Sequence, residues 1–242
     1  IDEKQVVRPT ETGSIKLIKE AAEKFNAKIY EMPELKTQFR CGGSGNYLEK
    51  IESILRIEEK GTDIEADEET KMELRIVDSP HELKNLIDKK NKEKRNSARI
   101  TAGFCWRWSK PNRDWSLVKD VKIGDFEMPW ENKNEFWKWA TDDSGMEQVG
   151  TVYTSQGFEF DYIGVIFGND LVWNNETKSW YAKPENSHDS MAKRGNDGFV
   201  QHLKNVYRVL LTRAHKGVFI YFMDKGTEEY FRNKAKELRL RV

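Results

Sequence analysis

The sequence has few residues of the kinds that hold metals or cross-link small domains. It contains two cysteines and four histidines among 242 residues. Cys41 and Cys105 stand alone, which excludes both a disulfide framework and a CxxC metal site. The histidines are equally scattered, so we expect no metal site built from them.

Long hydrophobic runs and an excess of one charge are also absent. No apolar run approaches the roughly 18 residues of a membrane span, and no signal peptide is visible. We therefore expect a cytoplasmic protein with no membrane partner. Lys+Arg and Asp+Glu both total 41, so no global basic field indicates nucleic acid. That balance is weak evidence against such a partner. Eight tryptophans exclude a disordered chain.

The sequence lacks the G-x-x-x-x-G-K-[ST] loop that surrounds nucleotide phosphates with backbone amides and a lysine. One glycine-rich segment, Cys41-Gly42-Gly43-Ser44-Gly45, precedes a predicted helix. It fits an anion site at a helix start or a plain turn, and the turn is favoured. The chain begins with Ile1 rather than methionine, so we expect a fragment of a longer protein.

Segments with helical and strand periodicity alternate along the chain, which predicts an α/β fold with a parallel sheet covered on both faces. We predict helices over 15–25, 47–55, 80–87, from 199 to about 214, and from about 227 onward. We predict strands over 27–32, 74–77, 98–106, 149–152, 162–168 and 218–223, and a hairpin over 171–181. Gly217 is expected to cap the helix that carries Arg213 at its end.

Residues from about 109 to 148 have a different composition, rich in Trp, Asp, Asn and Lys, and we interpret them as an insertion of one or two short hairpins and a turn of helix. Aromatic side chains stack on nucleic-acid bases, so a nucleic-acid contact is one interpretation. Trp108 and Trp115, flanked by Lys110 and Arg113, are the candidates for it. For most of the tryptophans, packing between elements is favoured.

Four segments carry polar residues in an ordered series. They are Asp2-Glu3-Lys4-Gln5, Gln38-Phe39-Arg40, the run from Gly150 to Phe160, and Leu211-Thr212-Arg213-Ala214. In this order they resemble motifs III, IV, V and VI of superfamily 1 helicases. The segment from Ala98 to Ser109 narrows the resemblance to the bacterial Schlafen group 3-like DNA/RNA helicase domains. By itself, Arg213 would fit an ordinary solvated residue in a last helical turn equally well.

The resemblance implies a three-layer, RecA-like domain of the P-loop NTPase type. Residues 1–242 would be the second RecA-like helicase domain, with 1–13 a remnant of the preceding ATPase domain. It also implies ATP and Mg²⁺ as ligands of the intact protein, and DNA or RNA and a missing N-terminal RecA-like domain as partners.

The resemblance also assigns roles residue by residue. Arg40 and Arg213 would approach the γ-phosphate as arginine fingers, and Gln5, supported by Asp2, would sense it. Glu159 would bond the ribose, next to Gly157 in the same loop. The other two residues of that loop, Thr154 and Gln156, would couple the nucleotide to the nucleic-acid backbone.

Alternatives remain at two levels. Asp2-Glu3 also fits the acidic pair of a Walker B strand, although the glutamine three positions after the aspartate favours motif III. At the level of function, the chain fits an ATP-dependent helicase or translocase, a non-catalytic nucleic-acid- or protein-binding module, or a regulatory ATPase switch that does not unwind.

Overall fold

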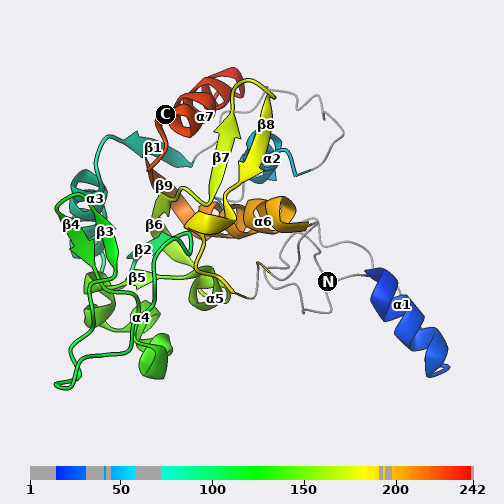
Figure 1. Cartoon of the computed structure of the whole chain (residues 1–242), viewed down its shortest axis with the longest axis horizontal. Coiled ribbons are helices and arrows are strands. Elements are labelled where there is room, and N and C mark those ends of the chain that lie inside the picture. Colours follow the sequence, from blue (N-terminus) through cyan, green and yellow to red (C-terminus); the bar gives the residue numbers. More distant parts are fainter. Residues whose placement is uncertain are drawn as a thin grey trace.

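The computed structural model describes residues 15–30, 41, 45–57, 72–190, 193 and 198–240. Its centre is a five-stranded, all-parallel sheet with the strand order β1-β9-β6-β2-β5 (Figure 1). The strands are β1 (Glu73–Val77), β2 (Ala98–Ala102), β5 (Val149–Gly150), β6 (Phe160–Phe167) and β9 (Ala214–Phe222). The predicted α/β class and parallel sheet are confirmed.

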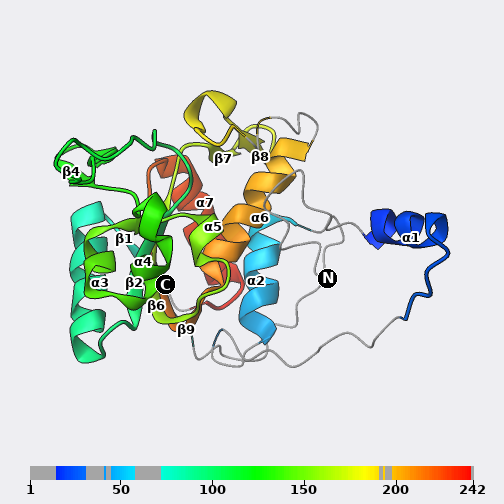
Figure 2. The same cartoon turned by 90° about the horizontal axis from the view of Figure 1, so that it is seen from below.

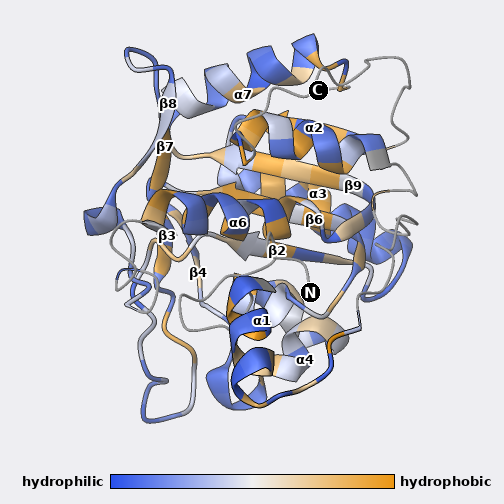
Figure 3. Ribbon diagram, turned by 90° about the vertical axis from the view of Figure 1, so that its right-hand side faces the viewer, coloured by the Kyte–Doolittle hydropathy of each residue, from blue (hydrophilic) through white to orange (hydrophobic). Residues whose placement is uncertain are grey.

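Helices cover both faces of the sheet. On one face lies α3 (Pro80–Glu93), and on the other lie α2 (Gly45–Leu55), α6 (Phe199–Leu211) and α7 (Lys225–Glu237). Strand β6 shows why both faces are apolar: Val165 packs toward α2 and α6, and Ile166 packs toward α3. Figure 3 shows the apolar β9 inside and the largely hydrophilic α7 outside. The result is the three-layer, RecA-like arrangement.

The ends of the helices follow from local hydrogen bonding. Ser79 caps α3, since its hydroxyl accepts from the backbone N–H of Glu82, and Pro80 occupies the first turn, where no N–H is needed. Asp224 caps α7 in the same way, by accepting from the N–H of Thr227. Helix α1 (Ile15–Lys24) and the hairpin of β7 (Leu171–Asn174) and β8 (Ser179–Ala182) also lie where the sequence predicts them.

The tryptophan-rich region after β2 contains one hairpin and a short helix, as predicted. These are β3 (Val121–Ile123), β4 (Phe126–Met128) and α4 (Phe136–Thr141), with 3₁₀ turns at Lys133–Glu135 and Asp143–Glu147. The segment just before these turns extends the sheet, because Trp130 bridges Val149 of β5 in parallel.

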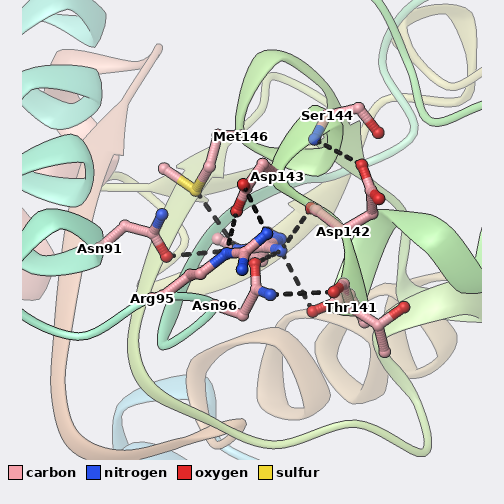
Figure 4. A network of polar contacts seen from close by, with 10 residues as sticks. Asn91, Arg95, Asn96, Thr141, Asp142, Asp143, Ser144 and Met146 are labelled. Atoms are coloured by element: carbon pink, nitrogen blue, oxygen red, sulfur yellow. Dashed lines mark hydrogen bonds and ion pairs between the residues drawn. The ribbon is translucent and has the colours of Figure 1, made fainter.

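A buried arginine ties this region to the sheet. Arg99 of β2 is 0% exposed and donates hydrogen bonds to the carbonyl oxygens of Trp139, Ala140 and Asp142 at the end of α4. It also donates to the side chain of Asn96, and Figure 4 shows the surrounding polar contacts. Desolvation lowers the pKa of Arg99 to about 10, so the guanidinium stays charged at neutral pH. Arg99 therefore supplies donors to the otherwise open carbonyl end of α4.

Three predicted elements are wrong in detail. Residues 27–30 form no strand, since all four are exposed and pair with no neighbouring strand. Strand β2 ends at Ala102, well before Trp106. The predicted strand over 149–152 stops at Gly150, and Val152–Ser155 forms a short helix, α5, where a polar loop was expected.

Gly217 does not cap a helix, so the prediction of a helix cap at this residue is wrong. It lies inside β9, paired with Glu73 and Tyr162. A Cβ at Gly217 would lie 2.9 Å from the Tyr162 ring, so close packing explains the absence of a side chain. Helix α6 ends without a glycine, where the hydroxyl of Thr212 donates to the carbonyl oxygen of Arg208 at 2.8 Å.

Candidate functional site

The amino ends of β6 and β9 bring two predicted site residues together. The backbone N–H of Phe160 donates to the carbonyl oxygen of Arg213 at 3.0 Å, and Phe160 pairs with Ala214. Glu159 directly precedes β6, and Arg213 directly precedes β9. These two residues, which the resemblance assigns to motifs V and VI, therefore stand on adjacent main chains at one edge of the sheet.

Arg213 is 3% exposed, so the interpretation of it as an ordinary solvated residue is wrong. Its position depends on packing between α2 and α6, which lie side by side (Figure 2). The hydroxyl of Tyr47 donates to the carbonyl oxygen of Leu211 at 3.0 Å. A second link between these helices is the ion pair of Arg208 with Glu52 at 2.7 Å, in which both side chains are largely buried. Arg213 thus lies two residues after the end of a helix that these two contacts hold in place.

Arg40, Gln5 and Asp2 lie outside the described residues. The chain next to Arg40 is nevertheless placed: Cys41 is buried, and its Sγ lies 4.0 Å from the carbonyl oxygen of Thr212. The residue that follows Arg40 therefore contacts the residue that precedes Arg213.

Glu159 pairs with a histidine that the sequence did not single out. The Nε2 of His215 lies 3.1 Å from a carboxylate oxygen of Glu159, and both side chains are more than one-third exposed. His215 is two residues after Arg213 and is the second residue of β9, so the pair stands at the same edge. Its signal in the sequence was its place directly after the segment Leu211-Thr212-Arg213-Ala214.

Gly157 has a φ of +127°, in the region that side chains rarely adopt. The chain turns there from α5 into β6, and Gln156 and Glu159 on either side are at least partly exposed. A glycine at this position is therefore required by the backbone and leaves the edge open beside Glu159.

Thr154 is directed inward, not toward the surface. It is 7% exposed, and its hydroxyl donates to Oε1 of Glu131 at 2.6 Å. Thr151 donates to the same carboxylate through its hydroxyl, at 2.9 Å, and through its backbone N–H, at 2.7 Å. Sequence reasoning missed Glu131, because a single glutamate in a polar, tryptophan-rich stretch has no distinguishing pattern.

Burial dominates the electrostatics of Glu131. The residue is 0% exposed, and desolvation raises the pKa of its carboxyl to about 7, although the hydrogen bonds from Thr154 and Thr151 favour the charged form. The donors to this carboxylate within the described residues are neutral: two threonine hydroxyls and one backbone N–H.

The two candidate tryptophans lie in different surroundings. Trp108 packs in an aromatic cluster with Phe104 and Trp130, and the ammonium group of Lys133 lies 4.4 Å from the centre of its ring. Trp115 is 79% exposed on a turn, with a φ of +67°. Trp115 is therefore available to a partner, and Trp108 combines packing with a cation–π contact.

Metal clusters and membrane-spanning helices are both absent from the described part of the chain. Across the described residues, no group of three or more His, Cys, Asp or Glu side chains could hold a metal ion. In that same part of the chain no helix is long and apolar enough to cross a membrane.

Comparisons with known proteins indicate the family of the chain. The family model described as "Schlafen group 3, DNA/RNA helicase domain" matches residues 1–224. An uncharacterized protein of Saccharomyces cerevisiae is 26% identical over 223 residues, which cover 84% of this chain and 48% of the yeast protein. The chain thus spans about half the length of this relative.

Proposed function

The chain belongs to the Schlafen group 3 DNA/RNA helicase domain family, and we propose that it is the second RecA-like half of an ATP-dependent helicase or translocase. In the intact protein it would close an ATP site whose Walker motifs lie on a preceding domain. The observation that supports this most is the adjacency of Arg213 and Glu159 at the amino ends of β9 and β6.

Arg213 fits the role of an arginine finger. Charge on a transferring phosphoryl group is stabilised best by a cation already fixed in place, which contributes about 10³–10⁵ in rate. Tyr47 and the end of α6 hold the chain at Arg213. The contact of Cys41 with Thr212 supports a second arginine, Arg40, at the same face.

The residues at this edge fit one side of a bound nucleotide. Glu159 is exposed enough to accept a hydrogen bond from a ribose hydroxyl, which would share the carboxylate with His215. ATP and Mg²⁺ would supply the phosphoryl group and neutralise its charge, while Gln5 and Asp2 would act from the linking segment. In this proposal the Mg²⁺ ligands belong to the preceding domain.

Nucleic acid is the proposed partner on two grounds. Gln156 stands on the turn at Gly157, beside the nucleotide edge, where it can report nucleotide state to a bound backbone. Trp115 offers an exposed ring for stacking on a base.

The test uses the full-length protein that contains this chain. We expect Arg213→Ala to lower the maximal rate of ATP hydrolysis about 10³-fold or more, while ATP binding changes little. Arg213→Lys should recover only part of the rate, because lysine cannot reproduce the planar fork. Arg75→Ala is the control, since Arg75 is about half exposed and pairs with Glu82 in the first turn of α3, beyond the carboxyl end of β1. Unchanged hydrolysis in a folded Arg213→Ala variant would refute the assignment.

A further inference from the structure

The carboxylate of Glu131 joins the tryptophan-rich region to the segment from Thr151 to Glu159, which we call the coupling segment. Glu131 accepts three hydrogen bonds, all from Thr151 and Thr154 at the start of this segment. The donor–acceptor distances lie between 2.6 and 2.9 Å. Both oxygens of the carboxylate are used.

The backbone holds Glu131 in place independently of these contacts. Its N–H donates to the carbonyl oxygen of Val149 at 2.9 Å, and Val149 donates to the carbonyl oxygen of Pro129. The stretch around Trp130 thus lies along β5 like an additional edge strand. Because β5 ends at Gly150, the carboxylate meets the first turn of α5 directly.

The coupling segment has little regular structure, and besides Glu131 it is held by the Tyr153 hydroxyl, which donates to Asp189, and by the buried side chain of Val152. Helix α5 has four residues, and Gly157 follows it with a positive φ. At its far end the segment carries Gln156 and Glu159, the two proposed contacts to nucleic acid and nucleotide. An anchor at one end of so short a segment therefore fixes the positions of the groups at the other.

We propose that Glu131 is a positioning residue, which fixes the coupling segment so that nucleic-acid binding is transmitted to the nucleotide site. This proposal rests on the proposed function. It also gives the tryptophan-rich region a role: that region supplies the residue that orders motif V.

The choice of substitution follows from the hydrogen bonds. Glutamine can occupy the same position, with its carbonyl oxygen accepting from the Thr151 N–H and its amide donating to the two threonine hydroxyls, which can rotate. Alanine removes all three acceptors. Glu131→Gln should therefore preserve the position of the segment, and Glu131→Ala should lose it. Glu127→Ala is the matched control, because Glu127 lies in the adjacent hairpin and makes only an exposed ion pair with Lys119.

Two measurements on the full-length protein test the proposal. In hydrogen exchange, Glu131→Ala should increase exchange of the amides from Val152 to Glu159, while those of β6 and β9 stay protected. In the ATPase assay, the same variant should lose roughly tenfold or more of the stimulation by single-stranded nucleic acid, since small displacements of positioned groups have effects of this size. Glu131→Gln and Glu127→Ala should keep both properties near wild type.

The outcomes separate the two hypotheses. If Glu131→Ala is folded and leaves both exchange and stimulation unchanged, the positioning role is wrong. Faster exchange without loss of stimulation would also overturn it, because the segment would then be anchored without being coupled. If nucleic acid does not stimulate the wild-type ATPase at all, the proposed function fails, and the exchange result still reports on the anchor.

Discussion

The buried carboxyl of Glu131 should make the stability of the protein depend on pH in a direction that few acids produce. Its pKa is raised from 4.5 in the unfolded chain to about 7 in the folded protein, mainly by desolvation. Between these values the folded state binds the proton and the unfolded state has released it, so the free energy of unfolding falls as pH rises. Below about pH 4.5 both states are protonated, and the destabilisation disappears.

The magnitude follows from the two pKa values. Integrating the difference in bound protons from pH 5 to pH 8 gives a loss of about 2.5 kcal/mol, at about 1.36 kcal/mol for each pKa unit. Glu131→Gln cannot titrate, so the variant should lack this part of the pH dependence. Relative to wild type, it should therefore gain about 2.5 kcal/mol of stability on going from pH 5 to pH 8.

Urea unfolding followed by tryptophan fluorescence at pH 5 and pH 8 measures this double difference, in which the other titrating groups cancel. The control is Glu127→Gln, because the hydrogen bond from Lys119 lowers the pKa of Glu127 and so predicts the opposite sign. If wild type and Glu131→Gln show the same pH dependence, the carboxyl is not desolvated and the reasoning fails. Glu131→Gln could be more stable than wild type at pH 8 and still hold the coupling segment in place. That result would show that the charged carboxylate of wild type lowers stability, as charged groups at functional sites often do.

Two other substitutions test the packing that positions the site. Arg99→Met should lower the free energy of unfolding by about 3 kcal/mol or more, because buried carbonyl oxygens at the end of α4 lose their donors. Urea titration measures this loss, with the exposed Arg95→Met as the control. An equal effect of both substitutions would contradict the prediction. Gly150→Ala should destabilise by about 1–3 kcal/mol, since its Cβ would lie 2.2 Å from the Trp139 ring. Gly226→Ala, in the first turn of α7, would bring the new Cβ no closer than 3.4 Å to another atom and should be nearly neutral in the same titration, so similar effects at both glycines would refute the packing argument.

The fold could be predicted from the sequence because its main elements have clear periodicity. The buried strands at Tyr162 and Val218 and the helix around Val206 each bury a continuous apolar set. Local signals failed where tertiary contacts decide the conformation. Residues 27–30 have strand-like composition but no partner strand, and Gly217 follows a helix but is required by the Tyr162 ring.

The candidate site also contains residues that the sequence could indicate and residues that only tertiary contacts reveal. The adjacency of Arg213 and Glu159 follows from parallel strand pairing, and the resemblance to helicase motifs pointed to both. Glu131 could not have been found, because it meets Thr154 only through the path of the chain between β2 and β5. The assignment of Asp2 and Gln5 to motif III rather than to a Walker B strand stays a prediction, since both lie outside the described residues.

The attachment of Arg213 to the sheet has a mechanical consequence. β9, which begins directly after this arginine, lies between β1 and β6 and is hydrogen-bonded to both. A displacement of the main chain at Arg213 relative to its own domain would disturb a strand that is hydrogen-bonded on both sides. In the proposed helicase, the main chain at Arg213 would therefore travel with the whole domain as a rigid lever, and the side chain, which is 3% exposed in this structure, would have to turn outward to reach the nucleotide.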